Sequence, residues 1–209
     1  MTAIVDRSRH QRDTGPDQQE HELRAVAHEL KTPLAIVFGY ATTLLQQPDL
    51  PEESRQWFLR VIANQSQRLL GAIDRLEELT RLEGGVTLEP VELLGSTREA
   101  AARTRQSIPG AMITEPSSDV PAAFVLAAHP WLDLALEEAL VACATAVGED
   151  GEVTIEGPDP DGELVRLHLC TTPNTQPQGL GVYLARRILE ALGGAVEQER
   201  GRFTFVLRG

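Results

Sequence analysis

Apolar residues in the first half of the chain recur at alternating four- and three-residue steps, the spacing of a helix with one buried seam. This periodicity predicts a long amphipathic helix from Gln18 onward, with its seam at Leu23, Ala27, Leu30, Leu34, Val37, Ala41 and Leu44. Residues 1–17 are polar, contain Gly15-Pro16 and lack this periodicity, so we expect them to form a flexible lead-in.

A second series of the same kind follows the interruption between Pro48 and Pro51. Proline and the acidic residues after it suit the first turn of a helix, and Gly84-Gly85 suits its end. The second seam comprises Phe58, Ile62, Gln65, Leu69, Ala72, Leu76 and Leu79. Residues 18–84 therefore predict a helical hairpin. Because two helices cannot enclose a core, we expect a second copy to bury the seam in a dimeric four-helix bundle; the alternative is packing onto the chain's own second domain.

After Gly85 the pattern changes to short β-branched runs separated by helical segments, which predicts a second domain over residues 85–209. Strands that cluster as hairpins late in the chain favour a mixed sheet covered on one face by helices. The fold class is therefore α plus α/β, a hairpin followed by an α/β sandwich. Strands are expected at 86–88, 111–115, 123–128, 152–156, 163–170, 194–199 and 202–207, and helices at 91–107, 131–147 and 180–192.

Composition and charge exclude several classes of function. The chain has 19 Lys and Arg against 31 Asp and Glu, and the resulting net charge of −12 disfavours nucleic acid and anionic membranes as partners. Cys143 and Cys170 lie far apart with no metal-type spacing, so we expect neither a disulfide nor a metal site, and a reducing cytoplasm is the expected location. No apolar run approaches the roughly 20 residues of a membrane span, and the start is too polar for a secretory signal.

His28 is the first candidate for chemistry. It follows the seam position Ala27, so its ring is expected to face outward, with Thr32 on the same face one turn later and Glu29 beside it. A carboxylate next to an exposed imidazole can orient one ring nitrogen and leave the other free to attack phosphorus. For a lone histidine the alternative is a solvent-exposed residue of an ordinary helix.

Pro33 lies inside the predicted helix. It removes one backbone hydrogen bond and its ring clashes with the carbonyl of Glu29, at a cost of about 3 kcal/mol or more. We therefore expect a kink or bulge beside His28, which points to function more than to folding.

Residues 28–34 read HELKTPL, which resembles the phosphoacceptor box of sensor histidine kinases. The resemblance implies that His28 accepts phosphate, that Glu29 assists proton transfer, and that Thr32 helps to position water for dephosphorylation of a partner receiver domain. It also implies a dimeric hairpin with this box on its first helix, in agreement with the periodicity.

Beyond His28 the outward face carries only small residues, Ala35, Gly39 and Thr42. Glycine inside a helix costs about 1 kcal/mol relative to alanine, so Gly39 needs a reason. We predict that these residues form a groove in which a receiver domain docks; simple tolerance of a poor helix former is the alternative.

From about residue 86 the order of elements resembles the ATP-binding domain of the same kinases. The resemblance puts Ala142 where the family has an Asn that binds magnesium, with Glu138 one turn earlier. Alanine offers no oxygen to a cation that requires oxygen ligands. Thr171 and Pro173 likewise replace the Asp and the first Gly of the turn that binds adenine.

The remaining motif of that domain is present but weak. Only residues 174–178 separate the turn from Gly179, which leaves little room for the family's flexible ATP lid. Gly179-Leu180-Gly181 matches the last glycine motif, where free N–H groups at a helix start meet phosphates, but such a pair of glycines is more often turn geometry. We therefore predict a degenerate nucleotide site and expect no cofactor and no metal.

Together these features predict a homodimeric phosphotransferase of a phosphorelay, in which His28 exchanges phosphate with an aspartate of a response-regulator receiver domain. Phosphatase activity supported by Thr32 is a further prediction, and an upstream kinase is a further candidate partner. Two alternatives stay open. One is an active histidine kinase whose unusual site uses Mg-ATP, and the other is a non-catalytic dimeric binding or inhibitor module.

Overall fold

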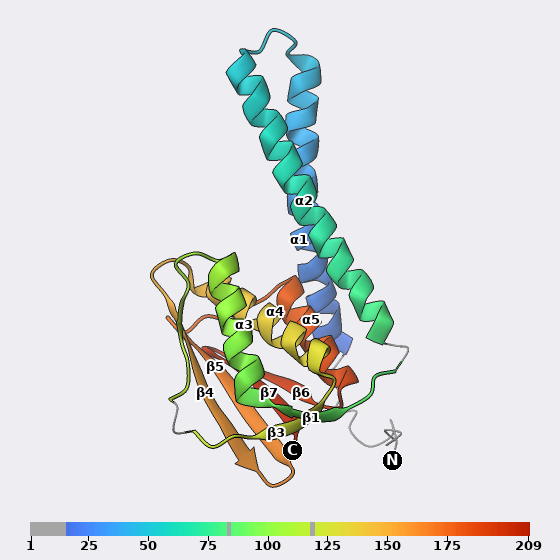
Figure 1. Ribbon diagram of the computed structural model, residues 1–209. Coiled ribbons are helices and arrows are strands. Elements are labelled where there is room, and N and C mark those ends of the chain that lie inside the picture. The colour runs from blue at the N-terminus through green and yellow to red at the C-terminus, as the bar shows by residue number, and fades with distance from the viewer. Residues whose placement is uncertain (1–15, 83–84, 118–119) are drawn as a thin grey trace.

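The computed structural model describes residues 16–209 apart from 83–84 and 118–119, and it has two parts (Figure 1). Helices α1 (Pro16–Gln46) and α2 (Glu52–Leu82) form a long antiparallel hairpin that projects from an α/β domain. The two predicted helices are therefore confirmed, and α1 begins two residues before Gln18. The rest of the expected lead-in lies outside the described residues.

The tip of the hairpin is held by aromatic packing and by one bond across the loop. The ring of Tyr40 on α1 lies 5.4 Å from that of Trp57 and 4.9 Å from that of Phe58, both on α2. Arg55 donates a hydrogen bond from its guanidinium to the carbonyl oxygen of Pro48 at 2.6 Å. These contacts fix the register of the two helices far from the second domain.

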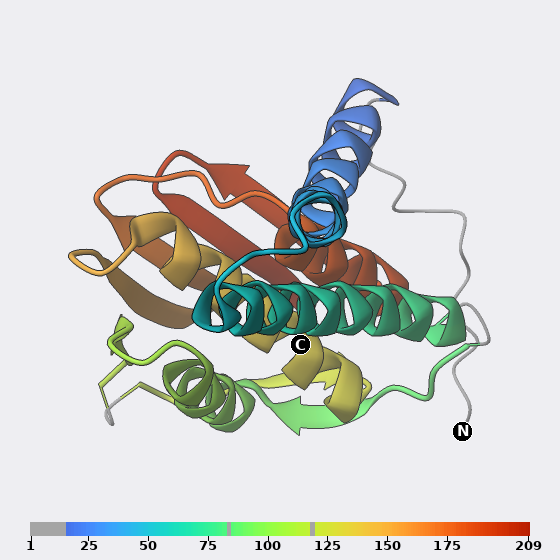
Figure 2. The same ribbon diagram turned by 90° about the horizontal axis from the view of Figure 1, so that it is seen from above.

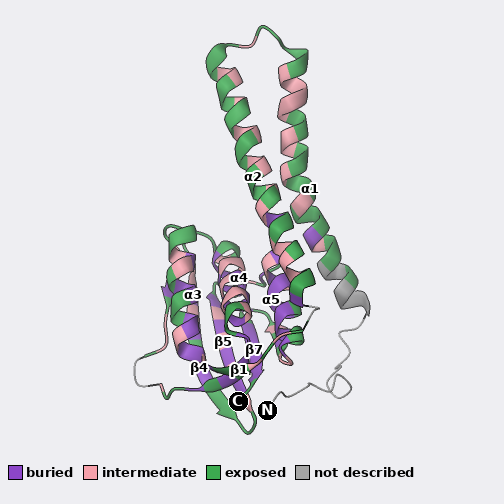
Figure 3. Ribbon diagram, turned by 45° about the vertical axis from the view of Figure 1, so that its right-hand side comes forward, coloured by how far each residue is buried: buried purple, intermediate pink, exposed green. Residues whose placement is uncertain are grey.

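The predicted seam of the hairpin is covered in one stretch and exposed in others. At the base, Leu30, Leu76 and Leu79 pack around a buried cluster that includes Leu184 of the second domain. Elsewhere Leu34 stays 54% exposed, and most of the hairpin beyond its base is exposed or half-buried (Figure 3). The chain's own second domain thus covers the base, which was the alternative to burial by a second copy, and it leaves an apolar surface further out.

The second part of the chain contains a mixed five-stranded sheet, as predicted, in the order β2-β4-β5-β7-β6. Strands β2 and β4 are parallel and the other neighbours are antiparallel. A separate two-stranded sheet pairs β1 with β3. The bounds are β1 Glu89–Glu92, β2 Met112–Thr114, β3 Phe124–Ala127, β4 Glu152–Asp161, β5 Leu164–Thr172, β6 Ala195–Glu199 and β7 Arg202–Arg208.

Three helices cover one face of this sheet, which confirms the expected arrangement: α3 (Leu93–Ser107), α4 (His129–Val147) and α5 (Leu180–Ala191) (Figures 1 and 3). Alternate residues of β5 face the core between the layers, and α4 is the most apolar helix, with eight buried residues. The largest fully buried side chains are Phe203, Phe205, Leu93, Leu132, Leu136, Leu140, Ile155, Leu167, Leu169, Leu180, Leu184 and Ile188.

Two predictions at the start of the second domain are wrong. Residues 86–88 are not a strand, and the expected helix start at 91 falls inside β1. Strand β1 begins at Glu89 because it pairs in antiparallel register with β3, so that Val91 lies opposite Val125.

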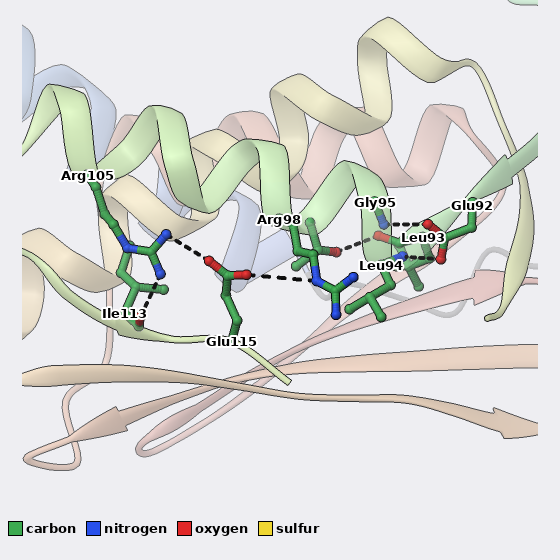
Figure 4. A network of polar contacts seen from close by, with 9 residues as sticks. Glu92, Leu93, Leu94, Gly95, Arg98, Arg105, Ile113 and Glu115 are labelled. Atoms are coloured by element: carbon green, nitrogen blue, oxygen red, sulfur yellow. Dashed lines mark hydrogen bonds and ion pairs between the residues drawn. The ribbon is translucent and has the colours of Figure 1, made fainter. Parts of the chain in front are cut away.

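Helix α3 starts at Leu93 because Glu92 caps it (Figure 4). The Glu92 carboxylate accepts hydrogen bonds from the backbone N–H groups of Leu94 at 3.0 Å and Gly95 at 2.6 Å. The same helix is tied to the segment after β2, since Glu115 accepts a bond from Arg105 at 2.7 Å.

No helix within the described ranges is long and apolar enough to cross a membrane.

Candidate functional site

His28 lies exposed on α1, on the part of the hairpin next to the second domain. Thr32, one turn later, is also exposed, and its hydroxyl donates a hydrogen bond to the backbone carbonyl of His28 at 3.0 Å. These two residues therefore share one face of α1, as the helical spacing predicts, and the imidazole is accessible to a partner.

The Glu29 carboxylate lies against the second domain. Its Oε2 accepts a hydrogen bond from the backbone N–H of Leu180, at the start of α5, at 2.6 Å. A methyl group placed on Gly179 would collide with the same carboxylate. Glu29, which was expected to assist His28, is thus hydrogen-bonded to a residue that lies 151 positions later in the chain.

Helix α1 is continuous through Pro33 but bent. Figure 2 shows its amino-terminal turns at a clear angle to the rest, which is seen end-on. Proline is the expected cause because it removes one backbone hydrogen bond and displaces the preceding turn. The part of α1 that precedes Pro33 contacts α5, since Val26 lies in one buried cluster with Leu180 and Leu184.

The small residues predicted as a docking groove lie on an open surface. Ala35 and Gly39 are exposed, and a Cβ atom added to Gly39 would meet nothing within 4 Å. Thr42 is half-buried, with its hydroxyl donating to the carbonyl of Phe38 at 2.7 Å. Space for a partner is therefore present, and docking itself stays a prediction.

A cavity of about 310 Å³ lies where the hairpin meets α4 and α5. It contains three of the positions that the kinase resemblance assigned to the nucleotide site, Glu138, Ala142 and Gly181. Its full lining is Glu29, Arg75, Glu138, Val141, Ala142, Thr145, Ala146, Gln178 and Gly181. Residues of α1 and α2 thus form one wall of the site predicted for the second domain.

Glu138 is the buried charge of this cavity. Its side chain is 7% exposed, and Nη1 of Arg75 on α2 lies 3.2 Å and 3.3 Å from its two carboxylate oxygens. Burial raises the pKa of Glu138 above its usual value, while the Arg75 guanidinium opposes that rise and nearby Glu137 and Glu29 add to it. A buried carboxylate needs such a partner, because an unpaired charge is costly in the interior.

Glycine at position 181 lets α4 and α5 approach closely. A Cβ atom there would lie 2.7 Å from the backbone oxygen of Glu138 and 3.2 Å from its Oε2. At the neighbouring Gly179, the N-cap of α5, φ is +96°, a conformation that favours glycine. Both glycines therefore have structural reasons, independent of any phosphate.

Thr171 and Pro173 lie apart from this cavity, since neither belongs to its lining. Thr171 is buried in β5, where its N–H donates to the Gly201 carbonyl at 2.9 Å and its hydroxyl accepts from the Thr175 N–H at 3.1 Å. Pro173 is exposed. Only some of the residues predicted for the nucleotide site therefore line the same cavity.

Sequence reasoning missed Arg75 and Gln178. A sequence signal existed for a partner of Glu138, because two adjacent acids, Glu137 and Glu138, interrupt an apolar helix segment, LALEEALVACA. Nothing in the sequence indicated which cation of the hairpin would supply it.

Other candidate chemistry is sparse. Within the described ranges no group of three or more His, Cys, Asp or Glu side chains could hold a metal ion. Cys143 and Cys170 are free thiols, and burial raises the pKa of Cys143 to about 12, which makes it unreactive at neutral pH.

Comparison with known proteins agrees with this geometry. Residues 18–85 match the His Kinase A (phospho-acceptor) domain. The chain is 32% identical over 94 residues to the circadian input-output histidine kinase CikA of Synechocystis sp., a match that covers 40% of this chain and 12% of CikA. The fold of this chain resembles that of the Acinetobacter baumannii histidine kinase AdeS, with a TM-score of 0.64 at 16% identity. The match covers 88% of this chain and 98% of AdeS.

Residues 18–85 thus form a histidine kinase phosphoacceptor domain, and the chain is similar to two-component histidine kinases. A second solved relative, full-length ShkA in complex with AMPPNP, has a TM-score of 0.57 at 25% identity and covers 90% of this chain and 45% of that one. The sensor-like histidine kinase SenX3 of Mycolicibacterium smegmatis is 29% identical over 147 residues, 65% of this chain and 38% of SenX3.

The chain therefore combines a hairpin that matches the phosphoacceptor domain with an α/β domain, and the two together have the fold of the histidine kinase AdeS. The chain spans 12% to 38% of the length of the curated relatives it matches.

Proposed function

We propose that this protein is a histidine phosphotransferase, which exchanges a phosphoryl group between His28 and an aspartate of a response-regulator receiver domain. The observation that carries the proposal is a contrast within one chain. His28 is exposed on the phosphoacceptor helix, while the cavity on the second domain carries Ala142, two glutamates and an arginine.

The residues around that cavity do not fit Mg-ATP. Ala142 has no oxygen for magnesium, and Glu138 already pairs with Arg75. The Glu29 carboxylate bonds to the start of α5, where the kinase resemblance would put phosphates, and it would repel them. Transfer of a phosphoryl group from ATP to His28 is therefore not part of the proposed function.

The proposed transfer needs only groups that the chain and a receiver supply. A neutral ring nitrogen of His28 forms a bond to the phosphorus of the receiver's aspartyl phosphate, and the phosphorus–oxygen bond to aspartate breaks. Aspartate leaves as a carboxylate, and the phosphoryl group stays on the nitrogen. The reverse steps return it. The exposure of His28 supports this proposal, because a receiver must reach the ring directly.

We also propose a homodimer. Apolar side chains stay exposed along the hairpin beyond its base, among them Leu34, Phe38, Leu45, Leu59 and Leu70. Contiguous exposed apolar surface on paired helices is typical of a bundle completed by another protomer. The open surface at Ala35, Gly39 and Thr42 is then the proposed receiver-docking groove, and phosphatase activity at Thr32 is a further proposal.

The experiment uses purified full-length protein and receivers carrying a labelled aspartyl phosphate. We expect acid-labile, base-stable label on the wild type and none on the His28→Ala variant. The conservative variant His28→Gln keeps a polar side chain and is expected to fail equally, which separates chemistry from surface change. Label from ATP and magnesium alone, retained by the wild type and lost in His28→Ala, would establish the kinase alternative instead. Intact signalling in cells that carry His28→Ala would establish the non-catalytic alternative.

A further inference from the structure

Two charged side chains of the hairpin line the cavity of the second domain. Glu29 comes from α1 and Arg75 from α2, while the other lining residues belong to α4, to α5 and to the segment before α5. The hairpin therefore contributes one anion and one cation to a cavity that the second domain forms with its own helices.

The Glu29 carboxylate caps the amino-terminal end of α5. The N-cap residue, Gly179, has no side chain that could accept a hydrogen bond from the first turn, and the Leu180 N–H donates to Glu29 at 2.6 Å instead. Free N–H groups and the helix dipole make a helix start attractive to anions. Glu29 thus acts as the cap that α5 lacks locally.

The cation lies beside the acid of α4. Arg75 Nη1 is within 3.3 Å of both oxygens of Glu138, and Glu138 precedes Ala142 by one helical turn. Arginine therefore provides positive charge close to the place where the kinase resemblance puts a magnesium ligand. A guanidinium suits a partly buried carboxylate because several donors are fixed in one plane.

Apolar contacts surround these two polar ones. Val26 and Ala72 of the hairpin are buried in one cluster with Leu180 and Leu184 of α5. Both polar contacts are therefore part of a packed interface between the hairpin and the second domain, and α5 contacts both α1 and α2.

We propose that the hairpin is an intramolecular ligand of this cavity, and that the docked state restrains Glu29 so that it cannot assist His28. The Glu29 contact holds the carboxylate against α5, and the Arg75–Glu138 ion pair holds α2 against α4. Release of the second domain then frees Glu29 to orient the His28 ring. The second half of this proposal rests on the phosphotransfer function proposed above.

The contact itself is tested without any phosphate, by amide hydrogen exchange of Leu180 in the isotope-labelled full-length protein. In Glu29→Ala the Leu180 N–H loses its acceptor, and we expect exchange at least about tenfold faster, the effect of one hydrogen bond to a charged group. Glu29→Gln keeps an oxygen and should give a smaller increase. Glu20→Ala, which removes an exposed acid of the same helix, is the control. Unchanged exchange in Glu29→Ala would overturn the contact.

The restraint is tested by the rate at which His28 accepts label from a phosphorylated receiver. The double variant Arg75→Gln/Glu138→Gln removes the ion pair without leaving a buried charge, and we expect transfer at least about threefold faster and Leu180 exchange faster as well. Glu29→Ala should also speed exchange but slow transfer, because His28 then has no carboxylate to orient its ring when the second domain is released. Arg68→Gln changes an exposed arginine of α2 and should alter neither.

Opposite effects on transfer distinguish a restraint from a merely structural contact. If the double variant speeds Leu180 exchange while transfer is unchanged or slower, the restraint is wrong and the interface is structural. If His28 accepts no label in the wild type, the phosphotransfer function fails, and with it the restraint, while the Leu180 exchange still decides whether the hairpin occupies the cavity.

Discussion

Replacement of Arg75 by methionine tests whether this residue neutralises the buried acid of the cavity. The substitution keeps a long side chain on α2 but leaves Glu138, whose side chain is 7% exposed, without its cation. Loss of one partner of a fully buried pair costs about 3–5 kcal/mol. Because Arg75 is itself 37% exposed, water screens the pair, and we expect a loss of about 2 kcal/mol near neutral pH.

The loss should depend on pH in a defined direction. Burial raises the pKa of Glu138 and Arg75 opposes that rise, so the variant's folded state takes up a proton more readily than the wild type. When the pKa of a carboxyl group is higher in the folded state than in the unfolded state, the free energy of unfolding falls as pH rises from the unfolded-state pKa to the folded-state pKa. The deficit of Arg75→Met should therefore shrink as pH falls from neutral toward the usual carboxyl range.

Urea unfolding at fixed protein concentration gives the measurement, since the stability of an oligomer depends on concentration. A Trp57→Phe background leaves Trp131 of α4 as the fluorescent reporter of the second domain. Arg68→Met is the matched control, and adding Glu138→Gln to Arg75→Met should restore most of the stability. An equal deficit at about pH 7.5 and about pH 5 would show that the unpaired charge of Glu138 is not the cause of the lost stability.

Substitutions at three further positions test packing and docking. Gly181→Ala should lower the free energy of unfolding by about 1–3 kcal/mol in urea titrations, because its Cβ would lie 2.7 Å from the Glu138 backbone oxygen; unchanged stability would contradict this close approach. Leu136→Ala, in the fully buried core of α4, should cost about 2–5 kcal/mol in the same assay, and a smaller effect would mean that α4 is not central. Gly39→Ala should raise the free energy of unfolding by up to about 1 kcal/mol, because alanine is the better helix former. Gly39→Trp should slow phosphotransfer and leave the dimer intact in sedimentation experiments. Unchanged transfer kinetics with Gly39→Trp would count against the docking groove.

The helical hairpin was predictable because its information is local. The seams of α1 and α2 repeat over many turns, and proline with two acids marks the start of α2 at Glu52. The later strands were predictable for the same reason, since runs such as β5 alternate buried and half-buried residues over their length.

Strand β1 was misplaced because its identity depends on a distant partner. Its sequence, EPVE, contains a proline and two acids that suit the first turn of a helix as well as a strand. Pairing with β3, more than 30 positions later, makes these residues extended, and no local pattern carries that information.

The exposed face of His28 followed from helical spacing, but the engagement of Glu29 did not. Its acceptor role depends on the Leu180 N–H, a backbone group with no sequence signature of its own. Arg75 is similar, because an arginine beside an apolar seam usually lies in solvent, and only the approach of α4 turns it toward Glu138.

Comparison of two phosphate donors for His28 distinguishes phosphotransfer from ATP-dependent kinase activity. Wild-type protein is incubated in parallel with Mg-ATP alone and with a phosphorylated receiver domain, and phosphohistidine on the peptide that contains His28 is measured by mass spectrometry under alkaline conditions. We expect phosphohistidine with the receiver, none with ATP, and none with either donor in His28→Ala. Phosphohistidine at position 28 from Mg-ATP alone would show instead that the protein is an active kinase.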